Sequence, residues 1–271
     1  MPLDIVIDRA HGGRWTSLRT TAGREWLWRR EAPEREKAAP GDAFVDAGGL
    51  EECIPTVRGA PDHGDAWSRP WTREGEADVV RCERFTLART VRTTIDGAVA
   101  DYVLTADAGF RFVWAAHVLL DLSDRARPHI REGARTRLFP EAARLLDRAW
   151  PDGASWVEGD WPEPCGLRLD RFGSDDGTAV GAVVDASDCC VHDRADTLSL
   201  GLESDGQPVS IALWRNLGGF PDRHPYHSTG VEPMLGRVFD LAEAGPGDAA
   251  RVPASGEARW RLTLTTNCRC A

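Results

Sequence analysis

Short runs of β-forming residues, each ended by glycine, proline or aspartate, follow one another through most of this 271-residue chain. Several runs alternate apolar and polar residues with period two, as strands do when one face is buried and the other is exposed. In RWRLTLTT (259–266), for example, Trp260, Leu262 and Leu264 share one face. The predicted strands are residues 3–8, 14–20, 24–30, 79–91, 99–107, 110–120, 178–185, 197–204, 208–216 and 257–266.

Helical patterns are scarce, which narrows the fold class. One stretch, PEAARLLDRAW from Pro140, predicts a helix, because proline suits a first turn and the alanines and leucines recur on one face. Strands do not alternate with helices and no glycine-rich phosphate loop is present, so a doubly wound nucleotide-binding sheet is not expected. Turn sequences at 174–178 and 204–208 fit hairpin connections. The chain is predicted to be all-β, with a single domain over residues 1–271.

Two segments lack any regular period. EAPEREKAAPG (31–41) is polar and rich in proline, which predicts an exposed loop. WPDGASWVEGDWPEPCG (150–166) holds three tryptophans and three prolines. It predicts a long irregular loop, and long ordered loops often line functional sites.

The formal net charge of −10 argues against nucleic acid or an anionic membrane surface as a partner, since both need a basic face. No segment approaches the roughly 18 apolar residues of a membrane span. The N-terminal residues lack the apolar run of a signal peptide. Seven cysteines without a repeating spacing do not predict a disulfide framework. We therefore expect a cytoplasmic protein, as a monomer or homodimer.

The segment PDHGDAWSRPW (61–71) gathers histidine, tryptophan and arginine within one short stretch. Gly64 would let the backbone pass close to a ligand. An indole face can contact the C–H groups of a polar ring with many hydroxyls, and a guanidinium can donate hydrogen bonds to those hydroxyls. His63, Trp67 and Arg69 are therefore candidate substrate-binding residues, because loops commonly carry function. The alternative is a surface loop with a solvated histidine.

Tryptophan is unusually frequent, with eleven residues against two tyrosines. Indole rings fill cores, but they also offer flat platforms to ligand rings. Trp214, in the predicted strand at 208–216, is a further candidate for substrate binding.

Two titratable residues stand in apolar surroundings. His117 lies in FVWAAHVLLDL (112–122), so its ring either has buried partners or lines a pocket with a pKa suited to proton transfer. Glu232 lies between Val231 and Pro233 in GVEPMLGR. It is either a capping or salt-bridged residue, or a carboxylate whose burial raises its pKa and strengthens it as a base.

The histidines and cysteines do not show the spacing of a metal site. His224 and His227 are three residues apart, but no third or fourth ligand accompanies them, so a turn is favoured. DCCVHD (188–193) and CRC (268–270) do not show a regular zinc spacing, and ordinary buried or free thiols are favoured. Neither a metal nor an organic cofactor is expected.

Three motifs together resemble one family. FVWAAHVLLDL resembles the histidine-bearing strand of the aldose 1-epimerase (galactose mutarotase-like) superfamily, GVEPMLGR resembles its C-terminal glutamate motif, and DHGDAW resembles its first His-Gly motif. GGLEECIPTV (48–57) is similar to a stretch of its uncharacterised bacterial branch. Their order and the chain length agree, so the resemblance spans essentially the whole chain. It implies a large antiparallel β-sandwich with one or two short helices.

The resemblance also implies an activity and roles for three residues. A carbohydrate epimerase would use His117 as general acid on the ring oxygen and Glu232 as general base on the anomeric hydroxyl, while His63 helps to hold the sugar. The partner is then a small-molecule sugar. Interconverting anomers requires a proton to leave the C1 hydroxyl while another reaches the ring oxygen, and the two groups must then exchange roles. We expect the acid and the base on different sides of the sugar.

Departures from the family pattern leave other functions open. Better-known relatives carry an early arginine and a mid-chain aspartate, for which Arg24 and Asp205 are candidates that we do not place in the site. A sugar-binding protein without turnover is one alternative. A glycoside-active enzyme with paired carboxylates, Glu51 or Glu52 with Glu232, is another. A cupin-type metal enzyme ranks lower, because no His-x-His with a following glutamate occurs.

Overall fold

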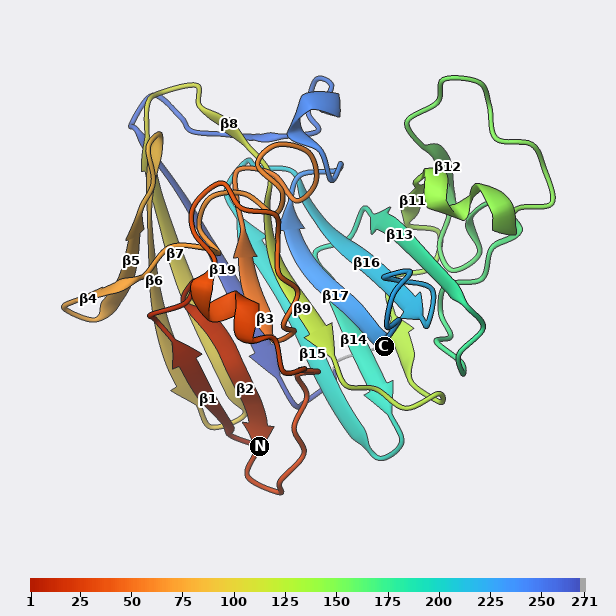
Figure 1. The fold of residues 1–271 in the computed structure, drawn as a ribbon, viewed down its shortest axis with the longest axis horizontal. Helices are drawn as coiled ribbons and strands as arrows, with labels where there is room; N and C mark the ends of the chain where they lie inside the picture. The colour runs from red at the N-terminus through yellow and green to blue at the C-terminus, as the bar shows by residue number, and fades with distance from the viewer. Residues whose placement is uncertain (269–271) are drawn as a thin grey trace.

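The computed structural model, which describes residues 1–268, is built from two large antiparallel sheets that pack face to face (Figure 1). One sheet has nine strands and the other has eight, and a small two-stranded ribbon joins two loops. This arrangement confirms the all-β sandwich predicted from the density of short strands.

The order of the strands across each sheet differs from their order along the chain. The nine-stranded sheet runs β1 (Leu3–Asp8), β2 (Arg14–Thr20), β3 (Leu50–Cys53), β9 (Trp114–Leu120), β17 (His227–Leu235), β16 (Val209–Leu217), β13 (Thr178–Val184), β11 (Arg135–Leu138) and β12 (Val157–Asp160). The eight-stranded sheet runs β10 (Arg127–His129), β14 (Asp188–Asp193), β15 (Asp196–Ser204), β19 (Glu257–Thr265), β7 (Gly97–Ala106), β6 (Phe85–Thr94), β5 (Ala77–Arg81) and β4 (Thr72–Glu74). The ribbon pairs β18 (Ala250–Arg251) with β8 (Arg111–Phe112), and the 3₁₀ helices are η1 (Pro33–Lys37), η2 (Pro140–Leu145), η3 (Pro164–Gly166) and η4 (Leu241–Glu243).

Strand β9 is buried on both faces, and its pleat divides its side chains between two apolar clusters. Trp114 and Ala116 belong to the core cluster between the sheets, whereas Ala115 belongs to a second cluster on the other face of the nine-stranded sheet. Because alternate residues share a face, His117 points to the same side as Ala115. Loops cover this outer face, and the candidate site lies beneath them.

A buried polar group lies in the core between the two sheets. Glu52 accepts hydrogen bonds from the Arg89 guanidinium at 2.7 Å, from the Tyr102 hydroxyl at 2.9 Å and from the Trp114 indole at 2.7 Å. Arg89 also donates to the carbonyl of Gly13 at 2.7 Å. Both partners of the ion pair are fully buried, and the buried Asp78 carboxylate lies 4.0 Å from the same guanidinium, so these side chains together supply the interactions that water would provide.

Several sequence predictions are confirmed and others are wrong. The strands predicted at 3–8 and 14–20 are present with those bounds, while residues 24–30 make only isolated bridges. The run at 79–91 forms two strands separated by a turn. The predicted helix from Pro140 is wrong, because only a short 3₁₀ helix forms before the chain becomes extended at Leu146.

The two predicted hairpin turns are also wrong. The turn at 204–208 joins β15 to β16, which belong to different sheets, so it carries the chain from one sheet to the other. The segment at 174–178 leads into β13 from η3 instead of linking two paired strands. Local turn chemistry therefore marks a change of direction without fixing which strand follows as a partner.

The segment 31–41, predicted as an exposed loop, contains η1 and a buried arginine. Arg35 is 2% exposed because its guanidinium reaches inward to Glu51. Segment 150–166 contains β12 and η3, and it does not contribute to the lining of the candidate site. None of the helices in residues 1–268 combines the length and apolar composition needed to cross a membrane.

Candidate active site

Strand register places three titratable side chains in one row on the outer face of the nine-stranded sheet. Glu51 on β3 is paired with His117 on β9. The register of β9 against β17 places Glu232 opposite His117 on its other side. Residues directly opposite one another in antiparallel strands have neighbouring side chains, so the fold itself brings His117 to Glu232.

The Glu232 carboxylate and the His117 ring lie side by side. Glu232 Oε1 is 3.8 Å from His117 Nε2, and the two residues are 2% and 7% exposed. A sugar ring cannot pass between groups this close, so the expected placement on different sides of the sugar is wrong. Gly230 shares this face, and a Cβ there would lie 2.3 Å from Glu232 Oε1. The glycine therefore leaves the space that the carboxylate occupies.

Burial moves the pKa values of these two groups toward each other. Desolvation raises the pKa of Glu232, which the neighbouring His117 and Arg58 only partly offset. Desolvation lowers the pKa of His117, although Glu232 acts in the opposite direction. A carboxyl with a raised pKa beside an imidazole with a lowered pKa can exchange a proton at little cost, which suits a pair that must serve as acid and base in turn.

His63 lies close to the same pair and is held from two directions. Its Nδ1 donates to the Asp62 carboxylate at 2.8 Å. Phe44 stacks on its ring with centroids 3.7 Å apart, and the rings of His63 and His117 meet edge to face at 5.1 Å. Burial acts to raise the pKa of Asp62, but the hydrogen bond and charge of His63 outweigh it, so that pKa is lowered.

Gly64 serves packing against the sheet and not the approach of a ligand. A Cβ at Gly64 would lie 2.0 Å from the carbonyl oxygen of Ile54, and its φ is +80°. The amide of Asp65 donates to the same carbonyl at 2.6 Å. The glycine therefore lets the 61–71 segment dock on the end of β3, and this docking positions His63.

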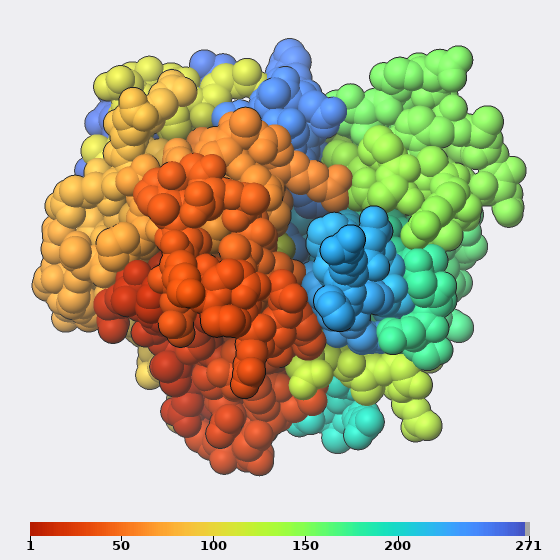
Figure 2. Space-filling model, in the orientation of Figure 1, coloured from red at the N-terminus to blue at the C-terminus, as the bar shows by residue number. Residues whose placement is uncertain are grey.

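These groups open into a cavity of about 430 Å³. In the space-filling view a recess separates the orange part of the chain from the blue segment near residue 220 (Figure 2). The lining combines aromatic rings with acids and one arginine: Phe44, Asp46, Val57, Arg58, Asp62, His63, His117, Glu141, Trp214, Phe220, Tyr226, Glu232 and Phe239.

Arg58 stands in the cavity wall with its charge already matched. Its guanidinium contacts both oxygens of Glu141, at 2.6 and 3.3 Å, and Glu141 also accepts from the amide of Gly181 at 3.0 Å. The Phe239 ring lies 4.5 Å from the guanidinium carbon. On the opposite side, the Tyr226 hydroxyl donates to Asp46.

Of the predicted binding residues, His63 and Trp214 line the cavity, while Trp67 and Arg69 lie outside its lining. Trp67 is 1% exposed, and its indole donates to the carbonyl of Asp62 at 3.1 Å. It packs edge-on against Phe44, so it supports the wall from behind. Arg69 is partly buried away from the cavity, where its charge opposes the raised pKa of Asp65.

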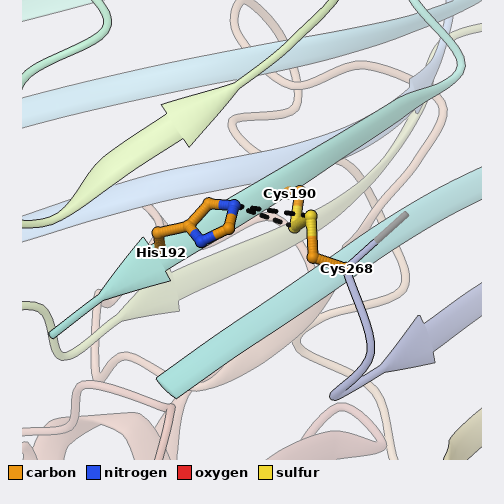
Figure 3. A group of neighbouring side chains, drawn as sticks. All are labelled: Cys190, His192 and Cys268. Atoms are coloured by element: carbon orange, nitrogen blue, oxygen red, sulfur yellow. Dashed lines mark hydrogen bonds between the residues drawn. A yellow bond between two sulfur atoms is a disulfide. The ribbon is translucent and has the colours of Figure 1, made fainter. Parts of the chain in front are cut away.

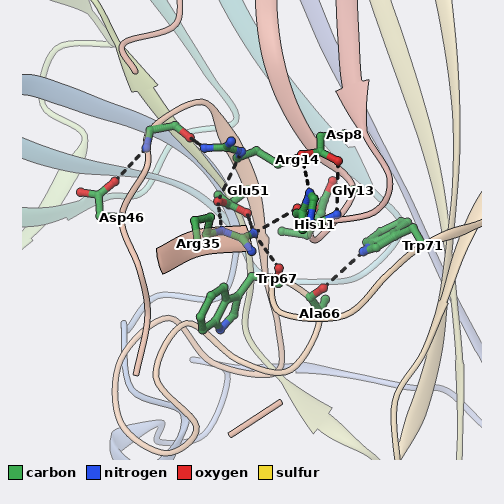
Figure 4. Close-up of polar contacts among 12 residues, drawn as sticks. Asp8, His11, Gly13, Arg14, Arg35, Asp46, Glu51, Ala66, Trp67 and Trp71 are labelled. Atoms are coloured by element: carbon green, nitrogen blue, oxygen red, sulfur yellow. Dashed lines mark hydrogen bonds and ion pairs between the residues drawn. The ribbon is translucent and has the colours of Figure 1, made fainter. Parts of the chain in front are cut away.

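The buried Glu51 is engaged by Arg35 (Figure 4). The guanidinium donates to both carboxylate oxygens, at 2.9 and 3.2 Å, and to the carbonyl of Trp67 at 2.6 Å. Glu52 points between the sheets. Neither residue lines the cavity with Glu232, so the structure gives no support to the paired-carboxylate glycosidase alternative.

The remaining sequence candidates lie elsewhere. His227 contacts Asp175 at 2.5 Å at the start of β17, and His224 is exposed in the preceding loop. Arg24 pairs with Asp193 at 2.8 Å. None of these lines the cavity, and the same is true of Asp205.

Sequence reasoning missed most of the cavity wall. Arg58 and Asp46 come from irregular segments and Glu141 from a 3₁₀ helix, where no periodic pattern marks a single charged residue as part of a site. Tyr226 was visible as one of only two tyrosines, in a segment that also holds two histidines. Its partner Asp46 is 180 residues away, and no sequence signal connects the two.

Comparison with known proteins supports the fold. No family model and no curated protein matches the sequence. Among solved structures, a candidate aldose 1-epimerase from Escherichia coli gives a TM-score of 0.66 at 12% identity, over 97% of this chain and 95% of that one. A galactose mutarotase related enzyme from Lactobacillus acidophilus gives a TM-score of 0.63 at 12% identity, over 98% of this chain and 95% of that one. A galactose mutarotase-like protein from Lactobacillus casei gives a TM-score of 0.59 at 16% identity, over 97% of this chain and 96% of that one.

Identities this low establish the fold alone. The chain has the large antiparallel β-sandwich fold of the aldose 1-epimerase and galactose mutarotase-like proteins, across nearly its full length. The fold hosts its chemistry in particular side chains, so activity has to be argued from the cavity itself.

Proposed function

We propose that this protein is a carbohydrate 1-epimerase that interconverts the anomers of an aldose. The observation that carries the proposal is the His117–Glu232 pair, 3.8 Å apart in the wall of a cavity of about 430 Å³. Pockets of roughly 300–1,000 Å³ suit small ligands. The aromatic rings of Phe44 and Trp214 offer faces to the C–H groups of a sugar, and the surrounding acids accept hydrogen bonds from its hydroxyls.

The chemistry follows from the two groups lying side by side. The C1 hydroxyl and the ring oxygen are both bonded to C1, so neighbouring groups can reach them together. Glu232 takes the hydroxyl proton while His117 donates a proton to the ring oxygen, and the C1–oxygen bond breaks to give the open aldehyde. Rotation about C1–C2 and closure on the other face return both protons by the reverse transfers.

The charges in the cavity favour a free aldose over a sugar phosphate. Four carboxylates line it, and its one arginine, Arg58, is paired with Glu141 at 2.6 Å. A phosphate would have to break that pair or approach the other three acids. The lining acids are Asp46, Asp62, Glu141 and Glu232.

The test is anomer equilibration followed by proton NMR after pure anomers of free and 6-phosphorylated aldoses are dissolved with the protein. We expect acceleration for a free aldose, and loss of about 10²–10⁴-fold in His117→Ala and in Glu232→Gln, because each removes one partner of the acid–base pair. Glu76→Gln and His11→Ala, which lie outside the cavity, serve as matched controls.

Other results would point elsewhere. Saturable sugar binding without acceleration would favour a non-catalytic binding protein of the same fold. Release of a new reducing end from a glycoside would favour a glycosidase. If no sugar bound, the proposal would fail although the fold stands. A cytoplasmic location, a single domain and a monomeric or dimeric state remain predictions.

A further inference from the structure

A second group of reactive side chains lies on the eight-stranded sheet, away from the cavity. Along β14, Cys189 and Val191 belong to the core cluster between the sheets. Cys190 and His192 alternate with them and therefore share the outer face of that sheet. Neither residue lines the candidate active site, which is formed on the nine-stranded sheet.

The segment after β19 brings a second cysteine to the same place. The Thr197 hydroxyl of β15 donates to the carbonyl of Thr266 at 2.8 Å, and the Ser199 hydroxyl donates to that of Asn267 at 3.2 Å. These two contacts hold the chain across β15. Cys268 then reaches Cys190 on the neighbouring strand β14, and the two form a disulfide. The sequence did not predict this bond, because its two cysteines lie 78 residues apart.

The two sulfurs also converge on one imidazole nitrogen (Figure 3). His192 Nε2 lies 3.5 Å from Cys190 Sγ and 3.4 Å from Cys268 Sγ. Zinc–sulfur and zinc–nitrogen bonds of about 2.3 and 2.0–2.1 Å at a tetrahedral angle require a sulfur–nitrogen separation of roughly 3.5 Å. Both observed separations therefore match the edges of a zinc tetrahedron, and only the sulfurs need to part.

We propose that Cys190, His192 and Cys268 form a binding site for a zinc-type divalent cation once the disulfide is reduced. Among the described residues, this is the group of three whose ligand atoms all lie within 4.8 Å of one another. Two thiolates and one imidazole are donors that zinc favours over harder cations. Water, or the exposed ring of His129 whose centroid is 4.8 Å from that of His192, takes the fourth position.

The chemistry of the exchange balances. A phosphine reductant with one water supplies two electrons, which break the sulfur–sulfur bond and leave two thiols and a phosphine oxide. The cation then displaces both thiol protons to solvent and binds the thiolates. Oxidised and metal-bound forms exclude one another, since they use the same two sulfurs.

The test uses the full chain, reduced with a phosphine and titrated with Co²⁺ as a spectroscopic probe. We expect one Co²⁺ per chain, with sulfur-to-metal charge-transfer absorption and the intense visible bands of tetrahedral cobalt, both removed by adding Zn²⁺. The oxidised protein should show neither. His192→Ala should weaken binding by more than about 100-fold, because loss of an outer hydrogen-bond partner alone costs 10–100-fold.

Controls separate this site from other thiols. Cys190→Ser and Cys268→Ser should each lose the charge-transfer absorption, whereas Cys165→Ser, a cysteine outside the group, should keep it. Retention in Cys268→Ser with loss in Cys268→Ser/Cys270→Ser would overturn the assignment of Cys268. Absence of cobalt–sulfur absorption in the reduced protein would overturn the site itself. Far-ultraviolet circular dichroism checks that each variant is folded.

Discussion

Burial of the Glu232 carboxylate lowers the stability of the folded chain when the carboxylate is ionised. Its carboxylate is 2% exposed and lies 3.8 Å from the His117 imidazole, whose pKa burial lowers. Water would solvate the ionised carboxylate better than this wall does, which is why its pKa is raised. The residue is therefore placed for reactivity and not for stability.

A pH-dependent gain in stability should follow from Glu232→Gln. The folded chain holds the Glu232 proton more tightly than the unfolded chain, in which the glutamate pKa has its ordinary value of 4.5. The free energy of unfolding therefore falls as pH rises from 4.5 through the raised pKa of the folded chain. Neutral glutamine removes that loss. We expect the variant to exceed the parent in stability at neutral pH and the gain to disappear below pH 4.5.

Urea denaturation across this pH range measures the effect. Glu76→Gln, an exposed carboxyl at a turn, provides the matched control and should show no such trend. A Glu232→Gln variant that is less stable than the parent at neutral pH would contradict the argument.

At the residue scale, the sequence predicted the titratable residues that interrupt apolar runs but not the other charged residues of the cavity wall. His117 and Glu232 stand out because titratable groups interrupt apolar runs. Arg58 and Glu141 do not, because Arg58 precedes a glycine in an irregular segment and Glu141 follows a proline at a helix start, where charged residues are common. Only folding brings them 2.6 Å apart.

At the scale of the element, β17 shows how one strand prepares a site. Its pleat turns Gly230 and Glu232 toward the cavity face, and the absent side chain of Gly230 makes room for the carboxylate. The position of Glu232 in the strand is not sufficient to place its carboxylate, because a larger residue at position 230 would displace it.

Gly230→Ala should therefore reduce activity while the fold is retained. The new Cβ would lie 2.3 Å from Glu232 Oε1, and a displacement of about 1 Å at a catalytic group can cost about 100-fold. Anomer equilibration by NMR measures the loss. Gly201→Ala, in β15 with open space at its Cβ, is the matched control and should leave the rate unchanged. Equal rates for both variants would contradict this role for Gly230.

Predictability at this scale depended on the strength of the local pattern. Alternating strands such as 259–266 were visible, and Trp260, Leu262 and Leu264 are indeed buried. Short elements were not: β3, β10 and β11 have three or four residues each, too few for a period to emerge. The segment after Pro140 has helical periodicity, yet its chain becomes extended at Leu146.

Across the whole molecule, the two sheets are tied by the buried pair of Glu52 and Arg89. Glu52 belongs to the nine-stranded sheet and Arg89 to the eight-stranded sheet, and both side chains are fully buried. Tyr102 adds a second hydrogen bond across the same gap at 2.9 Å. These buried polar contacts link the two layers within the large apolar cluster that packs between them.

Glu52→Gln should lower the free energy of unfolding by up to about 3–5 kcal/mol. It removes the carboxylate that contacts the buried Arg89 guanidinium at 2.7 Å and leaves Asp78, at 4.0 Å, as the remaining counterion. Chemical denaturation gives the value. Glu74→Gln, which breaks the exposed pair with Arg81, is the comparison and should have little effect. A small change in Glu52→Gln would mean that Asp78 and the Gly13 carbonyl are sufficient partners for the buried guanidinium.

The fold class could be predicted from the sequence because it depends on counting strands and turns. The strand order could not, because it depends on pairing between distant segments. β9 lies between β3 and β17, and no local signal identifies either neighbour. The active pair exists only through that pairing, which places residues 117 and 232 opposite one another.

The register of β17 against β9 makes the position of Glu232 sensitive to insertions in the strand but not to insertions in the preceding loop. One residue inserted within β17 ahead of Glu232 would turn the carboxylate to the face between the sheets. One residue inserted in the loop at 218–226 would leave the alternation intact. Phe220 and Tyr226 of that loop line the cavity. A change in loop length can therefore alter the cavity wall while His117 and Glu232 stay opposite one another.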